Sequence, residues 1–228
     1  DSVAAFDSES PHQIPGAELF YEHVHMNFKG NYILAQSLLS GIREILPPPP
    51  QSSASAVFSE EETAQMIGYT DYERIVYLNL VYLSFLQRPP FTTQLYHEQH
   101  LAAVKRQIDD QLLSLKKRGL GGCLEQHRQA LLRRPDDWQM RFQYAAFLNS
   151  GMHDTQAEET ELRKVIRQCP YDLAYLNLGR NLNSQNRNRD AQTVLTDFLK
   201  YVPYDVEIHG ELAAIYANRG ETELAISH

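Results

Sequence analysis

Carboxylate and imidazole side chains gather near the start of the chain, in the run Glu22-His23-Val24-His25. Groups of these two types transfer protons or bind metal ions. A metal centre would need both histidines, with Glu22 or His12, on one side of the chain. Alternating residues of an extended segment point to opposite sides, which argues against chelation by the pair. We therefore predict no metal site here and no cofactor for the chain.

A second histidine pair, His97 and His100, invites comparison with the zinc-binding His-Glu-x-x-His motif. That motif needs its second histidine four residues after the first, where this chain has Leu101. We interpret the pair as part of a solvated polar helix face.

The segment from Glu22 to His25, followed by Asn27 and Gly30, resembles the last conserved block of the SGNH (GDSL-type) hydrolases. In that family an acid three residues before a histidine orients and charges the imidazole, which deprotonates a serine far upstream. A glycine and a C-terminal helix follow the block. The resemblance implies that His25 is a catalytic base and that Glu22 is its orienting acid.

The match covers about residues 15–46 and departs from the family in three ways. Glu22 stands where the family has Asp, Met26 stands where Pro is common, and no Gly-Asp-Ser block precedes the run. The resemblance then implies the tail of a hydrolase-like domain that is inactive by this mechanism alone. A histidine-rich surface loop before a helix is the alternative interpretation.

Prolines punctuate the second half of the chain at Pro135, Pro170 and Pro203, a period of about 34 residues. Between the last two, apolar residues recur at helical spacing on both sides of a polar turn, which is typical of two antiparallel helices. This helix–turn–helix period resembles the tetratricopeptide repeat (TPR). The residues at that family's fixed positions are Tyr175, Leu178, Gly179, Leu182, Ala191 and Pro203.

The resemblance is strong over residues 135–228 and weaker over 101–134, where we predict a degenerate unit. The unit that ends at Pro170 fits with one extra residue in its turn, near 151–155. The last unit stops inside its second helix at His228.

Stacked repeats form a curved array whose first helices line the concave side. Amide and guanidinium groups there suit an extended peptide backbone or a carboxylate. Some family members clamp a carboxylate with an Asn that follows the Leu-Gly pair, but this chain has Arg180 there, so that clamp is not predicted. An ordinary solvated face is the alternative interpretation. The candidate peptide-binding residues are Gln143, Asn177, Arg180, Asn181, Ser184 and Glu211.

Ahead of the repeats, residues 1–18 are polar and rich in turn formers, so we predict an irregular arm. An amphipathic helix is predicted from Tyr32 to Leu46, and four prolines must end it. Its large apolar face favours packing on another part of the chain or on another copy. The predicted organisation is an arm and helix over 1–46, a Pro/Ser-rich linker over 47–56, a helical adaptor over 57–100 and TPR-like repeats over 101–228.

The composition of the chain limits the classes of function that it can have. The chain has 228 residues, 43% of them hydrophobic, so it can build a core. Its net charge of −8 argues against a nucleic-acid partner. No apolar run is long enough for a membrane span. Two cysteines make no disulfide framework, and the compartment is not predicted.

The chain starts at Asp1 rather than Met, so we expect a fragment of a larger protein. The sequence predicts an all-α fold, with a TPR-like array preceded by a helical adaptor and an N-terminal arm plus helix. The predicted function is a protein-interaction scaffold from a bacterial-type multidomain protein, with a protein or peptide ligand on the concave face. The alternative is the C-terminal part of an SGNH-type esterase or acyltransferase.

Overall fold

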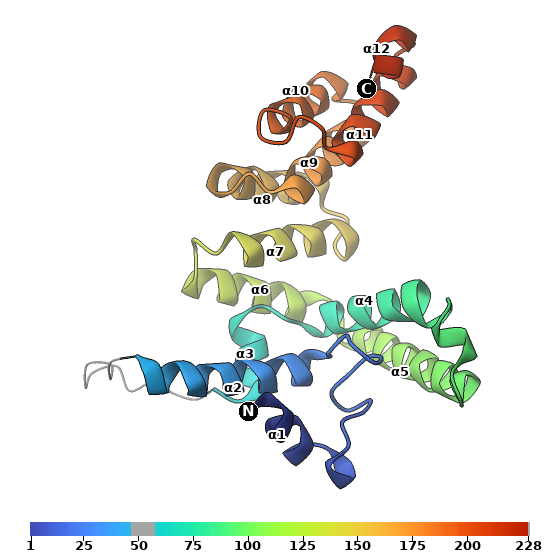
Figure 1. Ribbon diagram of the computed structural model, residues 1–228. Coiled ribbons are helices and arrows are strands. Elements are labelled where there is room, and N and C mark those ends of the chain that lie inside the picture. Colours follow the sequence, from blue (N-terminus) through green and yellow to red (C-terminus); the bar gives the residue numbers. More distant parts are fainter. Residues whose placement is uncertain (47–57, 228) are drawn as a thin grey trace. The chain divides into compact units, whose positions relative to one another are not determined.

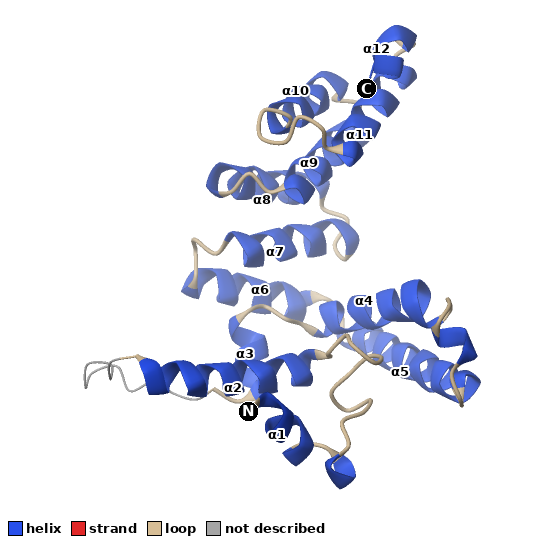
Figure 2. Cartoon of the chain, in the orientation of Figure 1, coloured by secondary structure: helices blue, strands red, loops and turns tan. Residues whose placement is uncertain are grey.

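The computed structural model describes residues 1–46 and 58–227, and the linker predicted at 47–56 lies outside them. These residues form helices joined by loops and contain no β-strand (Figures 1 and 2). The predicted all-α class is confirmed. Contacts divide the chain into two compact units, Asp1–Gly119 and Leu120–His228.

The first unit begins with a helix where the sequence predicted an irregular arm. Helix α1 (Ser2–Ser8) starts at Asp1, whose carboxylate accepts hydrogen bonds from the Val3 and Ala4 amides. Such a cap satisfies amides that have no partner within the helix. A short 3₁₀ helix, η1 (Pro11–Gln13), follows it.

Helix α2 (Phe28–Ile45) begins earlier than the predicted Tyr32. The Asn27 side chain caps it by accepting a hydrogen bond of 3.0 Å from the Gly30 amide. The same side chain donates to the Glu18 carbonyl at 3.0 Å, and this fixes the preceding loop on the helix start. Phe20 and Met26 form an isolated antiparallel bridge in that loop.

Capping boxes start the next two helices. Ser59 and Glu62 form the box at the start of α3, and Thr70 and Glu73 form the box at the start of α4. The remaining elements of this unit are α3 (Glu60–Met66), α4 (Asp71–Val81), the π-helical turn η3 (Tyr82–Leu86), the 3₁₀ helix η4 (Phe91–Thr93) and α5 (His97–Arg118).

Helices α4 and α5 enclose the core of the first unit, in which Leu78, Leu86, Phe91 and Ile108 are buried together. Helix α5 therefore packs with the first unit, although the sequence grouped its residues from 101 onward with the repeats. The boundary between the compact units falls at Gly119, and the four-part domain organisation stays a prediction.

The second unit begins with helix α6 (Gly121–Arg133), and successive antiparallel helix pairs follow it. Pro135, Pro170 and Pro203 all lie in loops that precede the first helix of a pair. The turn at 151–154 is one residue longer than the turn at 185–187, as predicted. The helices are α6 (Gly121–Arg133), α7 (Trp138–Ser150), α8 (Thr155–Gln168), α9 (Asp172–Ser184), α10 (Asn188–Phe198), α11 (Val206–Asn218) and α12 (Thr222–Ser227).

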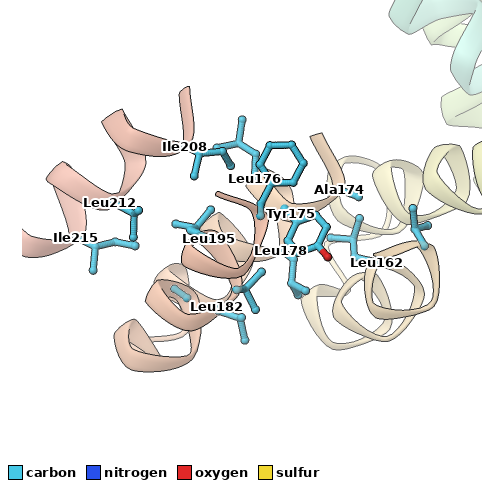
Figure 3. Close-up of a cluster of buried hydrophobic side chains, with 14 of the residues drawn as sticks. Leu162, Ala174, Tyr175, Leu176, Leu178, Leu182, Leu195, Ile208, Leu212 and Ile215 are labelled. Carbon is cyan, nitrogen blue, oxygen red and sulfur yellow. The ribbon is translucent and has the colours of Figure 1, made fainter. Parts of the chain in front are cut away.

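One apolar core runs through the helix pairs from α7 to α12 and joins each pair to the next. Leu178 of α9, Leu195 of α10 and Leu212 of α11 are fully buried and point into a shared interior (Figure 3). Gly179 lies where α9 crosses α10, because a Cβ atom there would be 2.6 Å from Leu195 Cδ2. Ala191 is likewise fully buried. The unit is thus a TPR-like helical repeat, in which the small residue Gly179 allows a close crossing of two helices.

Candidate functional site

A groove runs between the first helices of two successive pairs, α7 and α9. It encloses about 410 Å³ and is lined mainly by amide and hydroxyl side chains. Because these groups stand on packed helices, the backbone positions that carry them are fixed before any ligand arrives. The lining residues are Ala146, Asn149, Ser150, Thr155, Glu158, Asn177, Arg180, Asn181 and Ser184.

The structure brings four of the six predicted peptide-binding residues into this groove. They are Asn177, Arg180, Asn181 and Ser184. Gln143 is exposed on α7 and is not part of the lining. Glu211 also lies outside the lining, on α11, and accepts a hydrogen bond of 2.9 Å from Arg180 Nε. That ion pair links two neighbouring repeats and neutralises part of the charge that Arg180 brings to the groove.

Asn181 differs from the sequence prediction of an exposed recognition residue. It is only 5% exposed, and its side chain crosslinks three segments. Its Nδ2 donates to the Thr155 carbonyl at 2.9 Å and to Glu158 Oε2 at 2.5 Å, while its Oδ1 accepts from Gln185. A buried amide with all these bonds holds the helices together and has little capacity left for a ligand.

Glu158 is a groove residue that the sequence analysis missed. It comes from α8, the second helix of its pair, where we expected no groove residues. Its carboxylate is buried and accepts hydrogen bonds from Asn149 at 3.1 Å and from Asn181. Burial raises the pKa of Glu158, and the two amide hydrogen bonds offset only part of that rise. Within the described residues, no lysine or arginine pairs with this carboxylate.

The predicted catalytic pair lies in the first unit, in the loop before α2. His25 Nδ1 contacts Glu22 Oε1, as the SGNH resemblance implies for a base and its acid. His23 Nδ1 also lies 2.8 Å from Glu22 Oε2. Both imidazoles thus share one carboxylate, and our prediction that they point to opposite sides is wrong. The reason is a tight turn, in which the Val24 and His25 amides also donate to Glu22, at 3.1 and 2.7 Å.

This turn buries the acid and leaves the imidazoles accessible. The Glu22 side chain is 2% exposed, and His23 and His25 are more than half exposed. Burial would raise the pKa of Glu22, but hydrogen bonds from the His25 amide, the His25 ring and the Val24 amide outweigh it and lower the pKa. The rings of His23 and His25 lie 5.0 and 4.9 Å from those of Phe91 and Phe85.

Among the described residues, the groups that would complete a hydrolase or metal site are not assembled around this turn. In the part of the chain that the structure describes, neither imidazole is hydrogen-bonded to a serine hydroxyl. Across residues 1–46 and 58–227, no three potential ligands have the arrangement of a metal site. What the turn provides is an oriented imidazole beside a buried carboxylate.

Comparisons with known proteins give no family for this chain. No protein-family model matches it, and no curated protein does. A solved structure described as "MamA MSR-1 C2" is similar with a TM-score of 0.43 and 18% identity, over 73% of this chain and 86% of that chain. At this level the similarity carries no argument, so the fold assignment depends on the helix pairs themselves. None of the described helices is long and apolar enough to cross a bilayer.

Proposed function

We propose that the chain is a protein-interaction scaffold that binds an extended peptide in the groove between α7 and α9. The observation that carries this proposal is the lining of the groove by hydrogen-bonding side chains from three helices. Asn149 and Asn177 are at least partly exposed there, and an amide side chain both donates to and accepts from a peptide backbone. Rigid helices hold both groups, which lowers the entropic cost of binding.

The charge of the groove favours the peptide backbone over a terminal carboxylate as the recognised feature. Arg180 already contacts Glu211, and the carboxylate of Glu158 lies in the lining without a cationic partner in the described residues. A second carboxylate brought by the ligand would be repelled by the first. We therefore expect ligands whose bonds to Asn149 and Asn177 come from main-chain groups.

The test is selection of binders from a random peptide library against the full chain, followed by affinity measurements on the selected peptides. Asn177→Ala should weaken these peptides about tenfold, because a ligand bond is lost in a partly buried groove. Asn183→Ala is the matched control, since Asn183 lies on the same helix outside the lining and should leave affinity unchanged. Selected peptides that bind the Asn177→Ala variant as tightly as wild type contradict the proposal.

We also propose that helix α2 pairs with another copy of the chain. In its first half, Gly30 and Ile33 are buried inside the unit. Its second half presents Leu38, Ile42 and Ile45 to solvent, with exposures of 58%, 49% and 85%. An apolar stripe of this kind lowers its free energy by association.

The Glu22–His25 contact supports an alternative function. In this alternative, the chain is the C-terminal part of an SGNH-type esterase or acyltransferase from a larger protein. A base oriented by a buried acid is half of that machinery. Because no serine is bonded to the base in the described residues, we expect no hydrolysis of short acyl p-nitrophenyl esters. Reproducible turnover that disappears in His25→Ala would favour the enzyme over the scaffold.

A further inference from the structure

A cavity of about 210 Å³ lies within the first unit, among the start of α2, α3, α4 and α5. It is smaller than the cavities that hold drug-sized ligands, so it suits a molecule of about ten heavy atoms or fewer. Phe20, Leu78 and Val104 give it an apolar wall. The polar residues of its lining include Lys29, Glu60, Arg74, His100, Gln107 and Gln111.

Arg74 is oriented by two aromatic rings and forms only a long ion pair with an acid. Phe28 and Tyr69 stack with centroids 4.5 Å apart and an angle of 9° between their planes. The Arg74 guanidinium carbon lies 5.3 and 5.0 Å from those two centroids, in cation–π geometry. Glu61 Oε2 lies 3.7 Å from Arg74 Nη2, beyond hydrogen-bonding distance. The guanidinium is thus oriented and can still donate to an anion.

Gln111 supplies an acceptor that lacks a donor. Its Oε1 atom is buried and accepts no hydrogen bond from the residues that the structure describes. A buried polar atom without a partner costs free energy, which a ligand would recover by donating to it. Gln111 Oε1 is therefore a buried position at which a donor is needed.

The charge of the lining favours an anion. Lys29 and Arg74 contribute two cations against the single carboxylate of Glu60. Lys29 also forms an ion pair with Glu9, in which Nζ lies 3.2 Å from Oε2. Burial, followed by the hydrogen bond with Tyr21, raises the pKa of Tyr69, so the phenol adds no negative charge. Cations therefore outnumber carboxylates among the lining residues, although the net charge of the chain is −8.

We propose that this cavity binds a small carboxylic acid that combines an apolar body with a hydrogen-bond donor, such as an aliphatic α-amino acid. The carboxylate binds Arg74, the donor reaches Gln111 Oε1, and the apolar body packs against Phe20, Leu78 and Val104. Charge-assisted bonds from a guanidinium to a carboxylate are the strongest of these contacts. The site is independent of the groove between α7 and α9.

The test is a ligand-observed NMR titration of the full chain with three compounds that share one apolar body. L-Leucine has both polar groups, 4-methylpentanoate lacks the ammonium donor, and 3-methylbutylamine lacks the carboxylate. L-Leucine should bind about tenfold more tightly than either analogue, since each analogue leaves one protein group without its partner.

Gln111→Met keeps the length of the side chain and removes the acceptor. It should abolish the preference for L-leucine over 4-methylpentanoate, while Gln99→Met, an exposed change on the same helix, should leave the preference intact. Absence of binding by all three compounds overturns the proposal, as does an unchanged preference in a folded Gln111→Met variant. Should that variant not fold by circular dichroism, the ranking of the three compounds on wild type decides alone.

Discussion

Glu158 and Glu159 are adjacent on α8 and almost fully buried, yet their pKa values move in opposite directions. Burial dominates at Glu158, whose partners are neutral amides. At Glu159, burial would raise the pKa, but hydrogen bonds from Arg163 and Arg187 lower it. Arg187 Nη1 lies 2.7 Å from Glu159 Oε2 and comes from the next helix pair, so this ion pair ties two repeats together.

Glu159 should make the second unit sensitive to acid. Because its folded pKa lies below the usual 4.5, its stabilising contribution is present above that value and is lost as the pH falls through the folded pKa. We expect the melting temperature to fall between about pH 5 and about pH 3. Glu159→Gln should lower stability at neutral pH by about 1 kcal/mol and make the acid-induced fall smaller. An equally steep fall in the variant would exclude Glu159 as a source of the acid sensitivity.

The crossing of α9 and α10 at Gly179 leaves no room for a methyl group. Gly179→Ala would push against Leu195, which is fully buried, and should cost about 1–3 kcal/mol. Gly210→Ala on α11 is the matched control, because a Cβ there has nothing within 4 Å. The free energy of unfolding of that control should rise by about 0.5–1 kcal/mol, because alanine has a higher helix propensity than glycine. Urea unfolding followed by circular dichroism measures both, and changes of the same sign would contradict the assigned crossing.

At the scale of the element, apolar spacing and proline positions were enough to predict most of the helices. The helix pairs between Pro135 and Pro203 lie where the period placed them, and so does the longer turn at 151–154. The helix at Ser2–Ser8 was missed because it is short and depends on a single cap at Asp1. Each of these helices and turns depends on residues that are close in the sequence. A short sequence pattern is therefore the signal by which each can be predicted.

Side-chain environments depended on contacts between distant residues and were harder to predict. Asn181 was expected on an exposed face, but Thr155 and Glu158 of the neighbouring pair bury it. The cavity that includes Phe28, Arg74 and Gln111 has no signal in the sequence, since its walls come from segments far apart in the chain. Of the proposed groove, the four lining residues on α9 were among the predicted binding residues, whereas the lining residues on α7 and Glu158 on α8 were not.

Helix α2 should mediate self-association through its exposed second half. Replacing Leu38 and Ile42 with Glu should reduce dimer formation in sedimentation velocity at micromolar concentration, since two charges would face each other across the interface. Ser37 and Ser40 lie on the same helix, and glutamates at these positions serve as a charge-matched control. A wild-type chain that sediments as a monomer over the whole concentration range would argue against pairing by α2.

At the scale of the whole molecule, the two compact units predict where the chain can be cut. The core of the second unit is built from residues within 138–225, so residues 120–228 should remain helical and melt cooperatively. A longer fragment, residues 57–228, should keep the same transition. It should lose stability in the first unit, because Tyr69 and Leu78 would lose contacts with Tyr21 and Phe28. Thermal melts by circular dichroism compare the two, and loss of helix signal in 120–228 would show that the units depend on each other.

The central claim is that a peptide binds between α7 and α9, and the side-chain amide signals of the asparagines test it most directly. The full chain, labelled with ¹⁵N, is titrated with a library-selected peptide while a two-dimensional NMR spectrum is recorded. The account predicts that the side-chain amide signals of Asn149 and Asn177 shift with the peptide, while that of Asn183, outside the lining, does not. Shifts confined to residues 1–119, with Asn149 and Asn177 unchanged at saturation, would contradict it.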